Sequence, residues 1–222
     1  VRATELESHG ARGFTFTLRT SGHALAGERR VHVPAPGAHL VTNVLVAAGV
    51  GLAEGLQLDE VACALGQLAP GFRLRVRELT GGITLVDDSY NASPASTLAA
   101  LDLLAELPGR RLVLLGDMRE LGELSAESHR QVGQRVAERA DVIYTIGELG
   151  RAIGEAACAA GAEPDIVRHI GSHEEAAVIL NAELQPGDVL LVKGSRAMAL
   201  ERVVVALGPF ADAASSEDKA AP

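Results

Sequence analysis

Residues 83–94 read ITLVDDSYNASP, and this stretch decides the fold. The apolar run 83–86 has the composition of a buried strand. Ser93 followed by Pro94 is typical of a helix N-cap with proline at the first helical position, so a helix is expected over 95–106. Polar residues separate the two elements. A strand, a polar loop and a helix in this order form the repeating unit of a doubly wound α/β sheet.

The same unit recurs toward the C-terminus. Further apolar strands are predicted at residues 111–115, 142–146, 166–167 and 189–192. Further helices are predicted at residues 126–139, 149–160, 172–184 and 197–207, the third of them opened by capping-box spacing between Ser172 and Glu175. Five strands alternating with five helices predict a parallel, doubly wound, Rossmann-like sheet with right-handed crossovers.

The N-terminal third has a different pattern. Residues 14–18 and 30–33 alternate between apolar and polar side chains, which predicts an antiparallel hairpin, and helices are expected at 38–53 and 59–68. Ala69-Pro70-Gly71 is the best candidate for a boundary. The predicted organisation is a partial α/β domain over residues 1–71, a complete domain over 72–208, and a disordered tail over 209–222.

Composition excludes several classes of protein. The net charge of −9 argues against a general nucleic-acid binder, which would be basic. Uninterrupted apolar stretches are too short for a membrane span, and the start of the sequence does not have the pattern of a signal peptide. Cys63 and Cys158 have no metal-ligand spacing and are expected to be reduced thiols, so a cytoplasmic location is predicted and no metal site is assigned.

Polar residues gather where three of the predicted strands end. These segments are residues 87–94, 116–122 and 193–198. In doubly wound sheets, ligands bind at the carboxyl ends of the strands, so the three segments are expected to form one site.

The residues of these segments resemble a known family. The motifs are Asp88-Ser89-Tyr90-Asn91-Ala92-Ser93-Pro94, then Gly116-Asp117-Met118 with Glu120-Leu121-Gly122 and His129, then Lys193-Gly194-Ser195-Arg196 with Met198 and Glu201. They resemble the C-terminal domain of the Mur ligases, in the MurF branch. Upstream, Gly37-Ala38-His39 with Asn43 and Ala47-Ala48 resembles the helix that completes the family's nucleotide site. The resemblance covers nearly all of residues 10–208 and implies that residues 1–71 are part of the central, ATP-binding domain.

The resemblance implies an ATP-dependent ligase that joins a carboxylate to an amine through an acyl phosphate. In the MurF branch the substrates are UDP-N-acetylmuramoyl-tripeptide and D-alanyl-D-alanine. Asn43 matches the residue that approaches adenine, Arg73 the linker arginine that reaches the phosphates, and Asp88 the residue near the ribose; Asn91 is assigned to the same nucleotide site. Each side chain suits its role, because an amide reads a purine edge and a guanidinium stabilises charge during phosphoryl transfer.

The loop after the last strand is assigned to the other substrate. Lys193, Ser195 and Arg196 precede a helix, where cations and backbone N–H groups favour an anion such as the free carboxylate of D-alanyl-D-alanine.

Two departures from the family pattern stand out. Leu40 replaces the asparagine that many members have, and the phosphate loop G-x-x-G-K-[ST] does not occur in the chain. The ligands of the expected Mg²⁺ would therefore lie upstream, and the isolated chain is expected not to turn over.

Two kinds of alternative remain open. A sister Mur ligase or a folylpolyglutamate synthase would resemble Asp-Tyr-Ala-His or Asp-Gly-Ala-His at the first loop, where this chain has Asp88-Ser89-Tyr90-Asn91. A stand-alone nucleotide-binding or regulatory module would share the fold without the reaction. A phosphate loop about 200 residues before Asp88 would favour a ligase, and its absence would favour a module. Neither an oligomeric state nor roles for His39 and His129 follow from the sequence.

Overall fold

The chain forms two compact units, Val1–Phe72 and Arg73–Pro222. The computed structural model describes residues 1–22, 26–68 and 74–209. The expected disordered tail, apart from its first residue, lies outside the described residues, as does Arg73.

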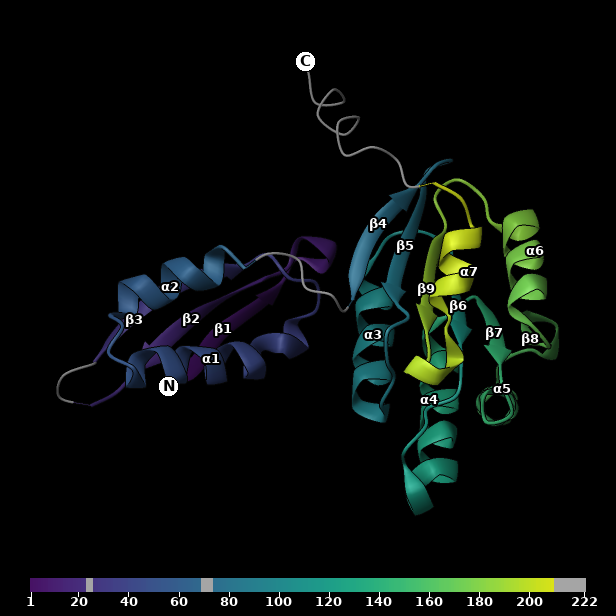
Figure 1. Cartoon of the computed structure of the whole chain (residues 1–222), viewed down its shortest axis with the longest axis horizontal. Coiled ribbons are helices and arrows are strands. Elements are labelled where there is room, and N and C mark those ends of the chain that lie inside the picture. The colour runs from purple at the N-terminus through teal and green to yellow at the C-terminus, as the bar shows by residue number, and fades with distance from the viewer. Residues whose placement is uncertain (23–25, 69–73, 210–222) are drawn as a thin grey trace. The chain divides into compact units, whose positions relative to one another are not determined.

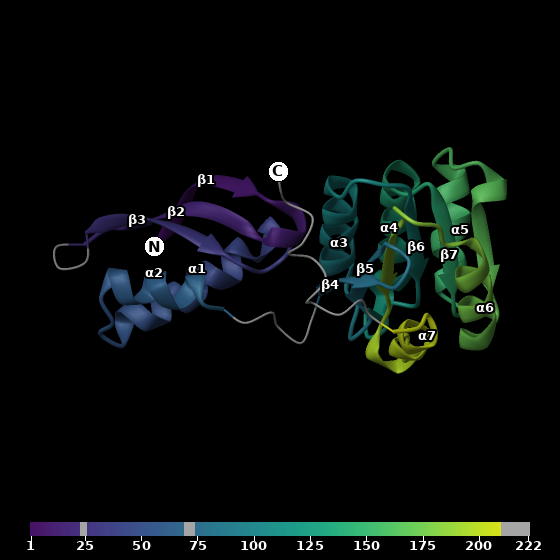
Figure 2. The ribbon, with the colours of Figure 1, turned by 90° about the horizontal axis from the view of Figure 1, so that it is seen from above.

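The first unit is a three-stranded antiparallel sheet with helices on one face (Figures 1 and 2). Its strands are β1 (Arg2–Ser8), β2 (Phe14–Thr20) and β3 (Gly27–Val33), and its helices are α1 (Val41–Ala53) and α2 (Leu58–Gly66). The predicted hairpin is confirmed, with Phe16 opposite Val31. Phe14, Phe16 and Leu18 are fully buried against the helices, because alternation places them on one face of β2.

Strand β1 was not predicted. Most of its residues are exposed, and the pairing with β2 shifts register between Thr4 and Glu7. An edge strand that is polar on both faces has no alternation of apolar and polar residues. It is recognised as a strand only from its hydrogen bonding to β2.

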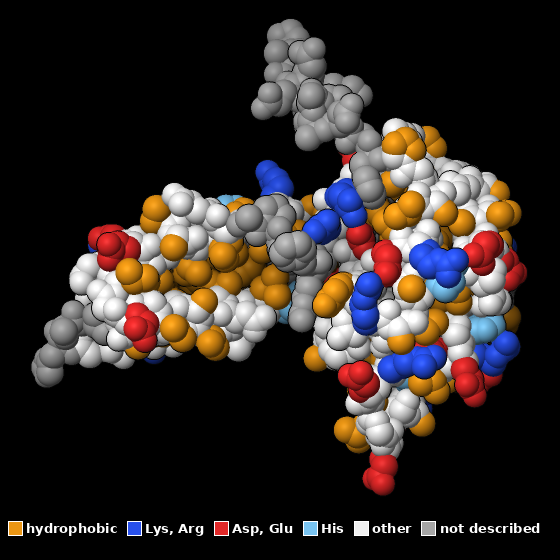
Figure 3. All heavy atoms as spheres, in the orientation of Figure 1, with side chains coloured by type: hydrophobic (Ala, Val, Ile, Leu, Met, Phe, Trp, Pro, Cys, Tyr) orange, Lys and Arg blue, Asp and Glu red, His pale blue; other side chains and the backbone are white. Residues whose placement is uncertain are grey.

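The helical face of the first unit leaves apolar side chains uncovered. Val46 and Val50 on α1 are 63% and 58% exposed, and Leu56 after the helix is also exposed. Figure 3 shows hydrophobic side chains gathered on this face, around α1 and α2. Large exposed apolar patches usually mark surfaces that pack against something else.

The second unit is built on a six-stranded sheet in the order β4-β5-β9-β6-β7-β8. The strands are β4 (Arg75–Leu79), β5 (Ile83–Asp88), β6 (Arg111–Leu115), β7 (Val142–Ile146), β8 (Val167–Ile170) and β9 (Val189–Lys193). The five predicted strands are present and pair in parallel. The prediction missed β4, which pairs antiparallel with β5 at the sheet edge and has one fully buried residue, Leu79.

Helices cover both faces of this sheet, which confirms the doubly wound prediction. Figure 2 shows α3 (Pro94–Glu106), α4 (Ser125–Arg139) and α5 (Gly150–Ala159) on one face, and α6 (His173–Glu183) and α7 (Glu201–Ala206) on the other. Each face has its own apolar core, one including Leu101 and Ile153 and the other Leu180 and Val203. Helix α7 is shorter than predicted, because a 3-10 turn at Arg196–Met198 is followed by Ala199 with φ of 48°.

The N-cap predicted for α3 is confirmed. The Ser93 side chain accepts a hydrogen bond from the Ser96 backbone N–H, and Pro94 is the first helical residue. The cap satisfies one of the amide groups that a helix N-terminus leaves without a partner.

Ser93→Ala is expected to lower the free energy of unfolding by about 1 kcal/mol, because the capping acceptor is lost. Urea unfolding followed by circular dichroism measures the change. Thr80→Ala, an exposed position in the turn between β4 and β5, is the control and should leave the midpoint almost unchanged. Equal midpoints for the two variants would show that the cap contributes nothing.

Candidate functional site

Three polar loops meet at the carboxyl edge of the second sheet. They follow β5, β9 and β6, which are adjacent and parallel. Because β9 lies between the other two strands, its loop at residues 194–198 is the central one. The prediction that the three segments share one edge is thereby confirmed.

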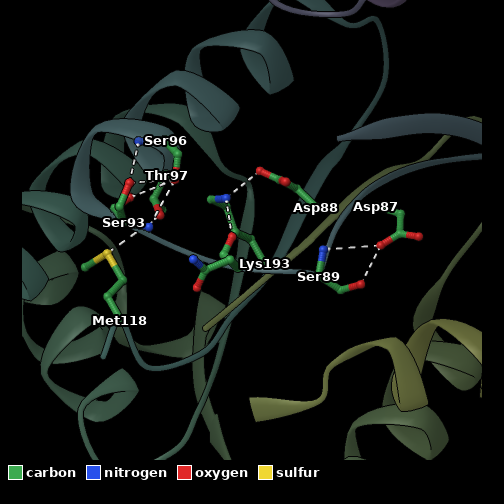
Figure 4. Close-up of polar contacts among 9 residues, drawn as sticks. Asp87, Asp88, Ser89, Ser93, Ser96, Thr97, Met118 and Lys193 are labelled. Carbon is green, nitrogen blue, oxygen red and sulfur yellow. Dashed lines mark hydrogen bonds and ion pairs between the residues drawn. The ribbon is translucent and has the colours of Figure 1, made fainter. Parts of the chain in front are cut away.

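A buried ion pair joins the first two loops. Asp88 and Lys193 are register partners at the ends of β5 and β9, and the Lys193 ammonium donates to the Asp88 carboxylate (Figure 4). The same ammonium lies 2.9 Å from the backbone carbonyl oxygen of Asn91. Lys193 is 1% exposed and Asp88 is 8% exposed. The pair therefore fixes the loop 88–91 to the end of β9.

The Asp88 carboxylate has a further partner. It accepts a hydrogen bond from the backbone N–H of Leu74, at the start of the described part of the second unit. Burial raises the pKa of the Asp88 carboxyl above its ordinary value, and the Lys193 ammonium and the Leu74 hydrogen bond only partly offset this rise. Asp88 is therefore bonded both to Lys193 and to the start of the described part of the second unit.

Asp87 has a structural role beside it. Its carboxylate accepts hydrogen bonds from the Ser89 backbone N–H at 3.2 Å and from the Ser89 hydroxyl at 2.6 Å, and it pairs with Arg77 on β4. This is the Asx turn expected of an aspartate at a strand end. Asp87 sets the turn, while Asp88 faces β9 (Figure 4).

Ser195 joins the second loop to the third. Its hydroxyl oxygen accepts a hydrogen bond of 2.7 Å from the Arg119 backbone N–H, and its own N–H donates to the Asp117 carbonyl at 2.9 Å. Ser195 is 4% exposed. The side chains of Lys193 and Ser195, which the sequence assigned to substrate binding, are thus bonded within the protein.

Arg196 is the exposed member of the predicted substrate loop. Its guanidinium lies 5.6 Å from the centre of the Tyr90 ring, and its Nη1 atom is 2.6 Å from the Glu201 carboxylate. A cation over an aromatic face is a weak attraction at an exposed site, and an exposed ion pair adds little. The Arg196 side chain therefore remains available to an incoming anion.

The remaining predicted residues are spread over the chain. Asn91 is exposed at the carboxyl edge, and Asn43 is exposed on α1 in the first unit. Arg73 lies outside the described residues. The structure thus brings together Asp88, Asn91 and the β9 loop, and gives no spatial relation of Asn43 or Arg73 to them.

Sequence reasoning gave no role to Asp117 or His129, although both stand in the quoted motifs. The Nε2 atom of His129 accepts a hydrogen bond of 3.0 Å from the Met118 N–H, and Nδ1 lies 2.7 Å from the Ser125 carbonyl oxygen. Because Nε2 accepts from an amide, Nδ1 is the ring atom that donates to the Ser125 carbonyl. The only signal for these two residues in the sequence was a polar motif followed by a histidine in a predicted helix.

Two hollows of the surface lie in the first unit. One, of about 630 Å³, is lined by Arg2, Arg19 and Glu28 among others. The other, of about 350 Å³, is lined by His9, Arg12 and His32. None of the predicted site residues lines either hollow.

The fold and this edge match a known family. The family profile described as "Mur ligase, glutamate ligase domain" matches residues 72–196. The chain belongs to the Mur ligase family. That match spans the three loops from Asp88 to Arg196, so the predicted resemblance is confirmed. No helix among the described residues is long and apolar enough to cross a membrane, and these residues include no cluster of three or more metal-ligating side chains.

Curated relatives in the Mur ligase family share the same name. The chain is 37% identical over 209 residues to UDP-N-acetylmuramoyl-tripeptide–D-alanyl-D-alanine ligase of Escherichia coli, covering 90% of this chain and 42% of that one. It is 33% identical to the ligase of that name in Bacillus subtilis, covering 80% and 39%. The chain therefore spans about two fifths of the length of these relatives.

Solved structures of Mur ligases have the same fold. MurF from Acinetobacter baumannii aligns with a TM-score of 0.79 at 28% identity, over 92% of this chain and 44% of that one. MurF from Thermotoga maritima, solved in complex with ADP, aligns with a TM-score of 0.72 at 25% identity, over 92% and 45%.

Proposed function

We propose that this chain is the C-terminal part of an ATP-dependent ligase that adds D-alanyl-D-alanine to UDP-N-acetylmuramoyl-tripeptide in peptidoglycan precursor synthesis. The observation that carries the proposal is the identity of 33–38% to ligases of that name, over 80–90% of the chain. In this reaction the tripeptide carboxylate takes the γ-phosphoryl group of ATP, which releases ADP. The dipeptide amine then attacks the acyl phosphate and displaces phosphate.

The carboxyl edge fits one part of a nucleotide. A carboxylate has about four acceptor positions, and in Asp88 the Lys193 ammonium and the Leu74 N–H use two of them. Two positions remain, which suits a pair of ribose hydroxyls. Asn91 is exposed, and its backbone carbonyl accepts from the same Lys193 ammonium. We assign Asp88 and Asn91 to the nucleotide, together with Asn43 at adenine and Arg73 at the phosphates.

No residue of this chain is assigned to Mg²⁺. When bound, the ion would supply positive charge to the phosphates. Asp88 is neutralised by Lys193, and the described residues contain no carboxylate cluster that would suit such an ion. The proposal therefore takes the metal ligands from the part of the relatives that this chain does not match.

The exposed apolar face of the first unit supports a partial central domain. Val46, Val50 and Leu56 are side chains that a complete α/β domain would cover. We propose that residues 1–71 belong to the ATP-binding domain and that residues 72–208 form the C-terminal domain.

Arg196 is the residue we assign to the carboxylate of D-alanyl-D-alanine. Its guanidinium is exposed and can form a bidentate pair with a carboxylate. Lys193 and Ser195, first assigned to the same role, instead hold the loop that carries Arg196.

The test uses the complete protein whose sequence includes this chain. ADP release should require both UDP-N-acetylmuramoyl-tripeptide and D-alanyl-D-alanine, with no activity when D-glutamate or diaminopimelate replaces the dipeptide. Arg196→Ala should raise the KM for the dipeptide by about 10-fold or more, since a charge-assisted hydrogen bond is lost. The control is Arg202→Ala, an exposed arginine paired with Glu174 on α6. Activity without the dipeptide would overturn the proposal, and equal kinetics for the two variants would overturn the role of Arg196.

A further inference from the structure

The loop after β6 contains a buried carboxylate that ties two strand ends together. Asp117 is 1% exposed, and its Oδ1 atom accepts hydrogen bonds of 2.9 Å from the backbone N–H groups of Leu149 and Gly150 at the start of α5. Negative charge at a helix N-terminus is favourable. Its Oδ2 atom lies 3.3 Å from Nη2 of Arg119, a residue that is itself largely exposed. Asp117 thus fixes the β6 loop relative to the end of β7.

His129 holds the same loop from the other side. His129 lies on α4, and its Nε2 atom accepts a hydrogen bond from the Met118 N–H. The hydrogen bond between its Nδ1 atom and the Ser125 carbonyl orients the ring. The three consecutive residues 117–119 are therefore bonded to α5, α4 and the β9 loop in turn.

The β6 and β9 loops are also pressed together at two glycines. The Gly116 N–H donates to the Lys193 carbonyl at 2.8 Å. A Cβ atom on Gly194 would lie 3.4 Å from the Gly116 Cα and 2.8 Å from a Leu200 methyl group. With such close approach, displacement of one loop must displace the other, because packed interiors do not deform gradually.

We propose that Asp117 and His129 are positioning residues of the ligase: they set the β6 loop, and through the Arg119–Ser195 hydrogen bond they set the β9 loop that carries Arg196. Neither side chain contacts substrate in this scheme. The coupling of the two loops stands on these hydrogen bonds and glycine contacts, whereas its effect on catalysis rests on the proposed function.

A matched pair of histidine variants tests the coupling. His129→Gln keeps an acceptor near the Nε2 position for the Met118 N–H, whereas His129→Asn reaches only to the Nδ1 position and keeps the Ser125 contact. Amide chemical shifts and hydrogen exchange are measured by NMR on the 222-residue chain. In His129→Asn, the amides of Ser195 and Arg196 should shift and exchange faster. His129→Gln should restore both.

A second pair tests Asp117 without removing it. In Gly147→Ala the new Cβ would lie 2.3 Å from Asp117 Oδ1, so the carboxylate must move. The same Cβ would lie 2.7 Å from Cε of Met198 in the β9 loop, so this pair is compared in a Met198→Ala background, where that second contact is absent. Gly161→Ala is the control, because Gly161 has a similar φ, 102° against 95°, and nothing within 4 Å of the added Cβ. Gly147→Ala should shift the Ser195 and Arg196 amides, and Gly161→Ala should not. Changes confined to residues 116–129 and 147–150 in both pairs would overturn the coupling.

Kinetics of the complete protein provide the functional readout. His129→Asn should lower kcat/KM for D-alanyl-D-alanine by about 10-fold with a much smaller change in the KM for ATP, and His129→Gln should recover most of it. Unchanged kinetics alongside the NMR shifts would overturn the catalytic part of the inference. A wild-type protein without ligase activity would instead defeat the proposed function, and the NMR result would still decide the coupling.

Discussion

Lys193→Met is expected to lower the free energy of unfolding of the second unit by about 3–5 kcal/mol, because it leaves the Asp88 carboxylate buried without its counter-ion. Methionine has a similar length, so loss of packing is small. Asp88 keeps only the Leu74 N–H among the partners described above. Breaking one side of a buried pair is costly even where the intact pair adds little net stability.

The loss should depend on pH in a defined direction. Burial already raises the pKa of Asp88, and removal of Lys193 takes away the main cause that lowers it. When the pKa of a carboxyl is higher in the folded state than in the unfolded state, the group stabilises the fold below its unfolded pKa. That contribution to the free energy of unfolding is lost as the pH rises through the folded-state pKa. The deficit of Lys193→Met should therefore be largest at neutral pH and should shrink on acidification as Asp88 takes up a proton.

Urea unfolding at several pH values measures this result. The double variant Lys193→Met with Asp88→Leu should recover much of the stability, since no buried charge remains. Arg202→Met, which breaks an exposed pair with Glu174, should change the midpoint little. If Lys193→Met unfolds at the same midpoint as Arg202→Met, the ion pair does not hold the loop.

Arg73→Ala in the complete protein is expected to lower kcat by about 100-fold or more, because groups that stabilise charge in a transition state contribute on this scale. Arg73 immediately precedes Leu74, whose N–H is bonded to Asp88. Arg73, proposed at the phosphates, is thus adjacent in sequence to a backbone N–H that is bonded to Asp88, the residue proposed at the ribose.

Paired kinetics and thermal melts decide the role of Arg73. Arg73→Lys keeps the positive charge but loses the planar set of N–H donors of the guanidinium. Its kcat is therefore expected to lie between those of wild type and Arg73→Ala. The melting temperature should be nearly the same in wild type and both variants. Unchanged kcat with a large fall in melting temperature would mean that Arg73 is structural, and its proposed role would be abandoned.

The sequence predicted the second sheet well, because its inner strands are continuous apolar runs between turn signals. It missed β1 and β4, whose side chains are mostly exposed or half-buried and show little of the pattern that burial imposes. It also made α7 too long, because nothing in the run from Arg196 to Leu200 shows that Ala199 takes a left-handed conformation.

The candidate site was predicted at the correct edge but with incomplete roles. Parallel strands end on one side, so the three loops had to meet there. Their order could not be read, since a sequence does not say that β9 lies between β5 and β6. That order is what places Lys193 beside Asp88. The pair predicts that Asp88→Ala loses stability and also binds nucleotide more weakly.

The central place of β9 also has a consequence for how the chain acquires its structure. Residues 189–193 are the last strand to be synthesised, yet they complete the hydrogen bonding of both β5 and β6. Until then the β4–β5 hairpin and the β6–β8 sheet each present an open edge. The Asp88–Lys193 contact closes a loop of 105 residues, a long-range pairing that forms slowly. Nascent chains of the second unit therefore stay open to misassembly until almost the whole domain has left the ribosome.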